Sequence, residues 1–150
     1  MPEAFEILIV EDNPLDLEMT LRGLRKANIA NRIHVARDGA EALECLFCEG
    51  AYADRRIEDA PRFVLLDLKL PKVDGLEVLA RLKADERTRG IPVVMLTSSK
   101  EQRDLVESYQ LGVNSYIVKP VDFEKFNEVV DQLGMYWMLL NQGATGGPPA

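Results

Sequence analysis

Acidic side chains directly follow two short apolar runs of this 150-residue sequence. Glu11 and Asp12 come after Phe5–Val10, and Asp67 comes after Phe63–Leu66. Carboxylates that are crowded together raise one another's pKa unless a cation compensates their charge. Mg²⁺ prefers one or two carboxylates, a carbonyl oxygen and a phosphate oxygen as ligands. We therefore predict a Mg²⁺ site in which Asp12 and Asp67 bind the ion directly.

Two further groups complete the predicted metal site. We expect the Glu11 carboxylate to act on the ion through a water molecule, and the backbone carbonyl of Lys69 to supply the last protein ligand. Beside such an ion, the Asp67 carboxylate can attack phosphorus as a nucleophile and form an acyl phosphate. The chemistry that this set of residues predicts is phosphoryl transfer to Asp67.

Two more apolar runs end in groups that can bind a phosphoryl group. Thr97 follows Pro92–Leu96, and Lys119 follows Ser115–Val118. A lysine supplies a mobile positive charge for the phosphoryl oxygens, and a threonine hydroxyl supplies a hydrogen bond. Pro120 directly follows Lys119. Since cis peptide bonds occur almost only before proline, we predict a cis bond here that fixes the direction of the lysine.

Each of these residues has a plain structural explanation when it is taken alone. An aspartate after a strand is often a helix cap, and lysines are mostly surface residues. Their common placement favours chemistry, because ligands of open parallel sheets bind beyond the carboxyl ends of the strands. Four of the five apolar runs end in groups of this kind. The exception, Arg32–Ala36, is predicted to lie at the edge of the sheet.

The elements that must position these groups alternate along the chain. The runs are short and rich in β-branched residues, which is typical of strands covered on both faces. The segments between them have helical periodicity, and the expected helices are Pro14–Lys26, Ala40–Cys48, Leu76–Ala84, Glu101–Leu111 ending at Gly112, and Phe123–Leu140. Five strand–helix alternations predict an α/β sandwich with a parallel sheet and right-handed crossovers.

The composition restricts the class of protein. A net charge of −7 and a pI near 4.8 argue against binding to nucleic acid or to an anionic membrane surface. No apolar run approaches the ~20 residues of a membrane span, and the first residues lack the basic region of a signal peptide. We therefore expect a cytoplasmic protein.

Cysteine, histidine and methionine residues are expected to be structural. Cys45 and Cys48 lie in a predicted helix and should stay reduced in the cytoplasm. His34 lies within a predicted strand, and packing is a better explanation for it than chemistry. Three methionines are expected to fill the core, namely Met19, Met95 and Met135.

The sequence resembles the receiver domains of two-component response regulators. The matching segments are ILIVEDN (Ile7–Asn13), LLDLKLPKVDG (Leu65–Gly75), PVVMLTSS (Pro92–Ser99) and SYIVKP (Ser115–Pro120). The resemblance implies a three-layer (βα)₅ sandwich of the flavodoxin-like type, with strand order 2-1-3-4-5. It also implies phosphorylation of Asp67 by a partner histidine kinase. Tyr116 would then be the aromatic switch that turns inward when Thr97 moves to the phosphoryl group.

Two features resemble the stand-alone regulators that are partnered with phytochrome-type sensor kinases, including bacteriophytochromes. They are the VEDNPLD start with the long connection Gly50–Pro61, and a long last helix that ends in MYWMLL (Met135–Leu140). This implies a receiver domain over residues 1–140 and a flexible tail over 141–150. No second domain is expected after Leu140.

Members of this subgroup often dimerise through the fourth helix, the fifth strand and the fifth helix. An exposed apolar cluster usually marks a partner surface. Here the predicted face consists of Leu105, Tyr116, Val118, Tyr136, Trp137, Leu139 and Leu140. Alternatively, Trp137 and Leu140 cap the end of the core. Leu17 and Leu21 either contact the kinase or widen the core face of the first helix.

Two other functions compete with a signalling switch. A phosphatase of the haloacid dehalogenase type also forms an aspartyl phosphate, but needs a second aspartate two residues after the nucleophile, where this chain has Lys69. A receiver-shaped scaffold that is never phosphorylated would not need its acidic residues, threonine and lysine intact. We therefore expect a phosphoacceptor that only makes and hydrolyses its own acyl phosphate.

Overall fold

The computed structural model describes residues 5–27, 29 and 31–134. Within them, the strands are β1 (Ile7–Val10), β2 (Ile33–Ala36), β3 (Phe63–Asp67), β4 (Val93–Thr97) and β5 (Ser115–Val118). The α-helices are α1 (Pro14–Lys26), α2 (Gly39–Phe47), α3 (Gly75–Ala84), α4 (Lys100–Ser108) and α5 (Phe123–Leu133). Two short 3₁₀ turns, η1 (Gly50–Tyr52) and η2 (Ile57–Asp59), lie between α2 and β3.

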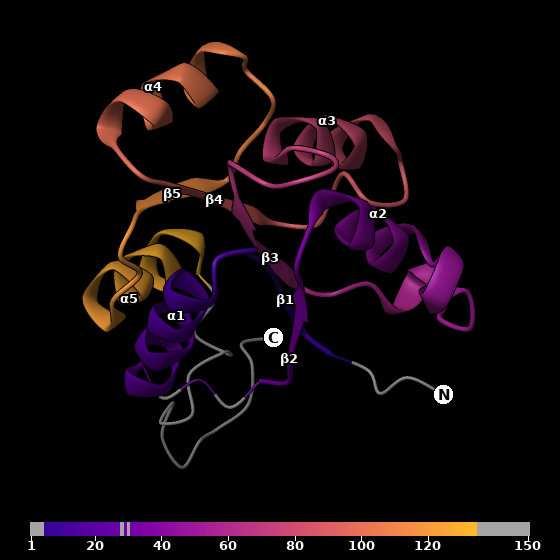
Figure 1. Cartoon of the computed structure of the whole chain (residues 1–150), viewed down its shortest axis with the longest axis horizontal. Coiled ribbons are helices and arrows are strands. Elements are labelled where there is room, and N and C mark those ends of the chain that lie inside the picture. The colour runs from indigo at the N-terminus through magenta and orange to yellow at the C-terminus, as the bar shows by residue number, and fades with distance from the viewer. Residues whose placement is uncertain (1–4, 28, 30, 135–150) are drawn as a thin grey trace.

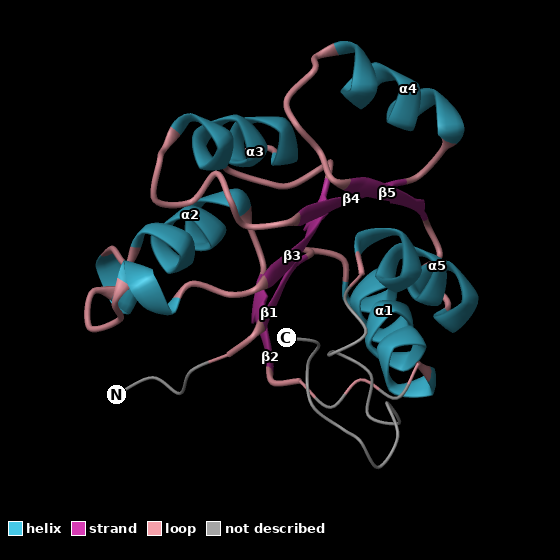
Figure 2. Cartoon of the chain, turned by 180° about the vertical axis from the view of Figure 1, so that it is seen from behind, coloured by secondary structure: helices cyan, strands magenta, loops and turns pink. Residues whose placement is uncertain are grey.

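The strands form one parallel sheet in the order β2-β1-β3-β4-β5, which confirms the predicted fold class and the edge position of β2. Helices α1 and α5 cover one face, and α2, α3 and α4 cover the other (Figures 1 and 2). Every residue of β1, β3 and β4 is buried, as expected for strands with helices on both sides. All five strands run in the same direction, so their carboxyl ends lie at one edge of the sheet.

Polar caps fix where the helices begin, on the same side of the sheet as the carboxyl ends of the strands. The Asn13 side chain accepts hydrogen bonds from the first turn of α1, and Asp38, Asp74, Ser99 and Asp122 do the same for the other four helices. Such a cap satisfies backbone N–H groups that have no partner within the helix. The loops that carry the site residues are thereby tied to rigid elements.

The ends of two helices differ from the prediction. Helix α4 ends at Ser108 rather than at Leu111, and Gln110, not only Gly112, adopts a positive φ of 52°. Helix α5 ends at Leu133, where Gly134 adopts a left-handed conformation. The rest of the predicted last helix and the tail, residues 135–150, lie outside the described residues.

The first helix also packs differently from the prediction. Met19 is 46 % exposed and does not fill the core, whereas Met95 does, and Met135 is not described. Leu17 lies on the inner face of α1 and is buried in the hydrophobic core between α1, α5 and the sheet. Leu21 is partly buried and packs against the same core cluster. Leu17 is therefore a core residue, which is the second of the two alternatives given for it.

His34 is held by a network between β2, α2 and η1. Its Nε2 lies 2.6 Å from the Tyr52 hydroxyl, and this hydroxyl donates to Glu41 Oε2 at 2.8 Å. Because a hydroxyl has one proton, His34 Nε2 must carry its own proton and donate it to Tyr52. Phe5 stacks on the imidazole at 4.8 Å, and the Arg55 guanidinium covers the Phe5 ring at 4.1 Å. This geometry agrees with a packing role for His34.

This network predicts a loss of stability in acid. Burial lowers the pKa of His34, although the Glu41 carboxylate acts in the opposite direction and Arg55 adds to the effect of burial. His34 therefore takes up a proton more readily in the unfolded chain than in the folded one. The free energy of unfolding falls as the pH drops below about 6.5, the pKa of an unperturbed histidine. We expect His34→Gln to lose less stability than the wild type between about pH 7.5 and about pH 5.5, measured by urea unfolding. Equal losses in the two proteins would contradict this.

The cysteines are free thiols, as predicted. Cys45 is buried, and burial raises the pKa of its thiol to about 12. Cys48, in the left-handed position that ends α2, is half-buried. Among the described residues, no helix combines the length and apolar character that crossing a bilayer requires.

Candidate functional site

Three carboxylates meet where β1 and β3 end. Oxygen atoms of Glu11, Asp12 and Asp67 all lie within 4.8 Å of one another. Glu11 and Asp67 are buried, and Asp12 is exposed. A small set of hard oxygen donors with one side open to solvent fits Mg²⁺, which keeps several water ligands. The residues predicted as the acidic part of the site are thus brought together.

Lys119 reaches into this cluster from the end of β5. Its Nζ lies 2.7 Å from Glu11 Oε1 and 3.2 Å from Asp67 Oδ1. Its side chain is only 16 % exposed. The backbone follows the prediction as well, because the Lys119–Pro120 peptide bond is cis. The lysine therefore points at the two buried carboxylates, as its place after β5 suggested.

The charges in the cluster are strongly coupled. Burial and the neighbouring Asp67 carboxylate raise the pKa of Glu11 to about 7, although the Lys119 ammonium acts in the opposite direction. Burial alone would lower the pKa of Lys119, but its hydrogen bonds with Glu11 and Asp16 raise the pKa above its usual value. Lys119 is therefore a permanent cation that partly compensates the carboxylates around it.

Thr97 supplies a hydroxyl without a partner. The residue is fully buried at the end of β4, and its Oγ1 has no hydrogen bond among the described residues. A buried unpaired hydroxyl is costly and calls for an explanation, such as an acceptor that binds only in another state. Phosphoryl oxygens are acceptors of this kind, so the geometry fits the predicted role of Thr97.

Asp16 is a contact of Lys119 that was not predicted from the sequence. It lies in the first turn of α1, and its Oδ2 accepts a hydrogen bond from Lys119 Nζ at 2.9 Å. An acidic residue in the first turn of a helix is normally explained by the helix dipole alone. No local pattern indicates its partner, which is 103 positions away along the chain.

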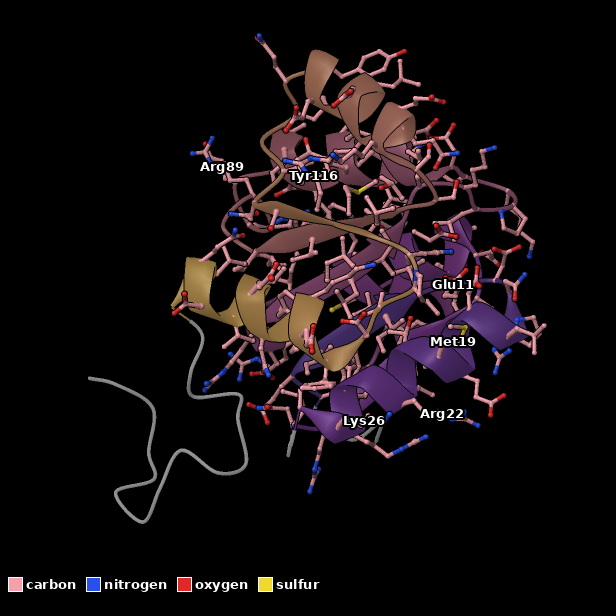
Figure 3. The ribbon with its side chains drawn as sticks, turned by 90° about the vertical axis from the view of Figure 1, so that its left-hand side faces the viewer. Glu11, Met19, Arg22, Lys26, Arg89 and Tyr116 are labelled. Atoms are coloured by element: carbon pink, nitrogen blue, oxygen red, sulfur yellow. The ribbon has the colours of Figure 1, made fainter. Side chains whose placement is uncertain are left out.

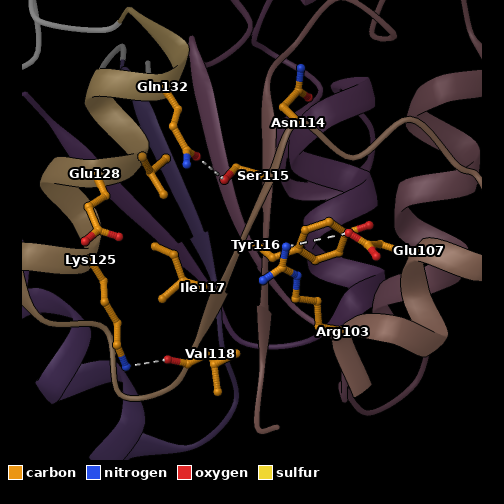
Figure 4. A pocket seen from close by; sticks show the side chains of 11 residues that line it. Arg103, Glu107, Asn114, Ser115, Tyr116, Ile117, Val118, Lys125, Glu128 and Gln132 are labelled. Carbon is orange, nitrogen blue, oxygen red and sulfur yellow. Dashed lines mark hydrogen bonds and ion pairs between the residues drawn. The ribbon is translucent and has the colours of Figure 1, made fainter. Parts of the chain in front are cut away.

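Lys125 is a second residue near Lys119 whose contacts were not predicted from the sequence. From the first turn of α5 its Nζ donates to the carbonyl oxygen of Val118 at 2.9 Å (Figure 4) and to that of Pro120 at 3.2 Å. These two carbonyls flank Lys119 on either side. Lys125 thus ties the loop that carries Lys119 to a helix.

Gly75 allows the close packing behind Asp67. A Cβ atom at this position would overlap the backbone oxygen of Asp67 and would lie 2.8 Å from that of Leu68. The Gly75 N–H instead donates to the Leu68 oxygen at 2.9 Å. Any larger residue must therefore push α3 away from the end of β3.

We expect Gly75→Ala to destabilise the protein by about 1–3 kcal/mol, which is the usual cost of overpacking a tight site. It should also weaken Mg²⁺ binding, because the strand end that carries Asp67 must shift. Gly90→Ala is the matched control, since a Cβ there meets no atom within 4 Å. Urea unfolding and calorimetric Mg²⁺ titration measure both effects. Equal stability of the two alanine variants would contradict the expectation.

The remaining predicted residues that the structure describes lie in the loop after β3, on α4 and on β5. Lys69 is exposed in the loop after β3, near Asp12. Tyr116 is half-buried on β5, and the Arg103 guanidinium lies 5.3 Å from the centre of its ring (Figure 4). Leu105 is 52 % exposed on α4, and Val118 is half-buried. The other residues of the predicted dimer face, Tyr136, Trp137, Leu139 and Leu140, lie outside the described residues.

The chain matches the model of the response regulator receiver domain over residues 7–131. A curated relative from Methanothrix harundinacea (strain 6Ac), described as the probable methanogenesis regulatory protein FilR2, is 43% identical over 141 residues. That alignment covers 93% of this chain and 88% of the relative.

The solved structures that this chain resembles are also response regulators. The bacteriophytochrome response regulator AtBRR is 55% identical with a TM-score of 0.83, and the alignment covers 94% of this chain and 100% of that one. The Mn²⁺-bound form of response regulator Rcp1 is 34% identical with a TM-score of 0.71, over 97% and 99% of the two chains. A solved response regulator of the same fold therefore has a divalent cation, Mn²⁺, bound to it.

Proposed function

Because this chain belongs to the response regulator receiver domain family, we propose that it is a signalling switch that accepts a phosphoryl group on Asp67 in a Mg²⁺-dependent reaction. One observation carries the proposal: the Asp67 carboxylate lies within the acidic cluster and also faces the Lys119 ammonium at 3.2 Å. The unpaired hydroxyl of Thr97, at the end of the neighbouring strand, supports it.

The proposed reaction uses a phosphohistidine of a partner kinase as donor. An Asp67 oxygen attacks phosphorus, the O–P bond forms, and the P–N bond breaks with its electron pair on the imidazole nitrogen. Lys119 and Thr97 bind the phosphoryl oxygens. Water later hydrolyses the acyl phosphate, which restores the carboxylate and releases inorganic phosphate. This self-hydrolysis is the only turnover that we propose.

Glu11, Asp12, Asp67 and the Lys69 carbonyl would hold Mg²⁺, with Glu11 acting through water. The bound ion supplies positive charge to the phosphoryl oxygens. The closeness of the three carboxylates, whose oxygen atoms lie within 4.8 Å of one another, supports this arrangement.

The direct test is incubation with acetyl phosphate and Mg²⁺. We expect intact-mass spectrometry to show the addition of one phosphoryl group, which hydroxylamine removes because acyl phosphates react with it. A chelator should abolish the addition. Labelling that persists in the chelator, or that resists hydroxylamine, would contradict the proposed chemistry.

A sensor histidine kinase of the phytochrome type is the proposed partner, in the cytoplasm. The likeness to a bacteriophytochrome response regulator supports this choice. We place the docking surface on α1 and the start of α5, where Leu15 is 71 % exposed, Met19 46 % and Phe123 39 %. Figure 3 shows Met19 along the same helix as Arg22 and Lys26. This surface lies beside the loop of Lys119.

The proposed output is association of two copies through α4, β5 and α5, with Tyr116 as the switch. The described part of this face is more polar than predicted from the sequence, because Arg103 and Glu107 form an ion pair of 3.7 Å beside Tyr116 (Figure 4). In a twofold dimer each patch meets its own copy, so a patch that carries both signs of charge can complement itself.

Light scattering should give the mass of a dimer when the protein has bound Mg²⁺ and beryllofluoride, which mimics the phosphoryl group. A monomer at high concentration in every state would contradict it.

A further inference from the structure

Three carboxylates contact the Lys119 ammonium, and they differ in what else they do. Glu11 at 2.7 Å and Asp67 at 3.2 Å belong to the cluster that can hold a metal ion. Asp16 at 2.9 Å does not belong to that cluster. An ammonium group has three N–H donors, so one donor per carboxylate accounts for all of them.

The backbone of Asp16 is held by the cap of α1. Its backbone N–H donates to the Asn13 side chain at 3.0 Å, within the cap of α1. Its side chain is 38% exposed, while that of Lys119 is 16% exposed. The pair therefore joins α1 to the loop that follows β5.

The contacts of Lys119 must change when the site is filled. Two of its partners are then engaged elsewhere, because Glu11 takes part in holding the ion and an Asp67 oxygen carries the phosphoryl group. Of the three carboxylates that contact Lys119 within the described residues, only Asp16 is engaged by neither event. It leaves two N–H donors for the phosphoryl oxygens while it keeps Nζ over the site.

We propose that Asp16 is a positioning residue for phosphoryl transfer, which holds the Lys119 ammonium toward Asp67 through the whole reaction. The inference rests on the proposed function and names a residue that acts on the phosphoryl group only through Lys119. Loss of a positioning partner typically costs about tenfold or more in activity.

The test compares Asp16→Asn with the wild type at saturating Mg²⁺ and acetyl phosphate. Asparagine keeps the shape and one oxygen acceptor but removes the charge. We expect phosphoryl uptake to slow about tenfold and the affinity for beryllofluoride to fall by a similar factor. Glu18→Gln is the matched control, since it removes a carboxylate from α1 that pairs with Arg22 and not with Lys119. Its uptake rate should equal that of the wild type.

A double-mutant cycle separates positioning from a structural role. In a Lys119→Met background, Asp16→Asn should slow uptake no further, because the group through which it acts is gone. In metal-free protein, the shifts of the urea midpoint caused by Asp16→Asn and by Lys119→Met should not add up in the double variant, because both changes remove the same ion pair. This second readout does not depend on activity.

Wild-type protein that takes up no phosphoryl group would overturn the proposed function itself. Where the wild type is labelled, an Asp16→Asn variant with unchanged or faster uptake would overturn the inference alone. Faster uptake would mean that Asp16 competes with the phosphoryl group for Lys119. The inference would also be overturned if Asp16→Asn slowed phosphoryl uptake by the same factor in the wild-type and Lys119→Met backgrounds.

Discussion

Replacement of Asp67 by asparagine is expected to abolish phosphoryl uptake, with a loss of at least about a thousandfold. The amide oxygen is a poor nucleophile. The other two carboxylates of the cluster, Glu11 and Asp12, are the proposed holders of the metal ion, and Glu11 is also paired with Lys119 at 2.7 Å. The measurement is the intact mass after incubation with acetyl phosphate and Mg²⁺.

The matched control for this change is Asp74→Asn. Asp74 caps α3 a few residues further along the same loop, and asparagine is an equally good cap, so its phosphoryl uptake should be unchanged. Asp67→Asn should also stay folded, because Lys119 keeps its contacts with Glu11 and Asp16. Undiminished labelling of folded Asp67→Asn protein would show that the acceptor is another residue.

The composition of the site could be predicted because it follows from one rule about parallel sheets. Glu11 and Lys119 directly follow strands, Asp67 and Thr97 are the last residues of strands, and the carboxyl ends of parallel strands lie at one edge. No knowledge of side-chain packing was needed for this step. The rule gives which residues meet, but it gives no distances between them.

The contacts that refine the site could not be predicted, since they join residues far apart in sequence or depend on tight packing. Asp16 looks like an ordinary acidic residue of a first helical turn, and its partner is known only once the fold brings the loop after β5 to the start of α1. Gly75 looks like a helix start after Asp74, yet its lack of a Cβ is required by the backbone of Asp67. On α1, a helical pattern with apolar residues on several sides could not decide that Leu17, and not Met19, faces the core.

Replacement of Lys119 by methionine is expected to have two effects of opposite sign. The change keeps the length of the side chain and removes the charge that compensates three carboxylates. Phosphoryl uptake should fall by about a hundredfold, the usual cost of losing one donor to the transferred group. Mg²⁺ affinity should rise, because the ion no longer competes with an ammonium group for Glu11 and Asp67. Calorimetric titration and the labelling rate measure the two effects separately.

The opposite signs make this variant more informative than one that merely loses activity. A damaged fold would weaken both Mg²⁺ binding and phosphoryl uptake, whereas loss of the Lys119 charge strengthens one and weakens the other. Without metal, the variant should also be less stable than the wild type, since buried Glu11 loses its ion pair, and Mg²⁺ should restore more stability to it than to the wild type. Lys100→Met, at an exposed lysine that begins α4, should change none of these quantities. Weaker Mg²⁺ binding by folded Lys119→Met would mean that the ammonium does not compete for the carboxylates, and that its role lies outside the acidic cluster.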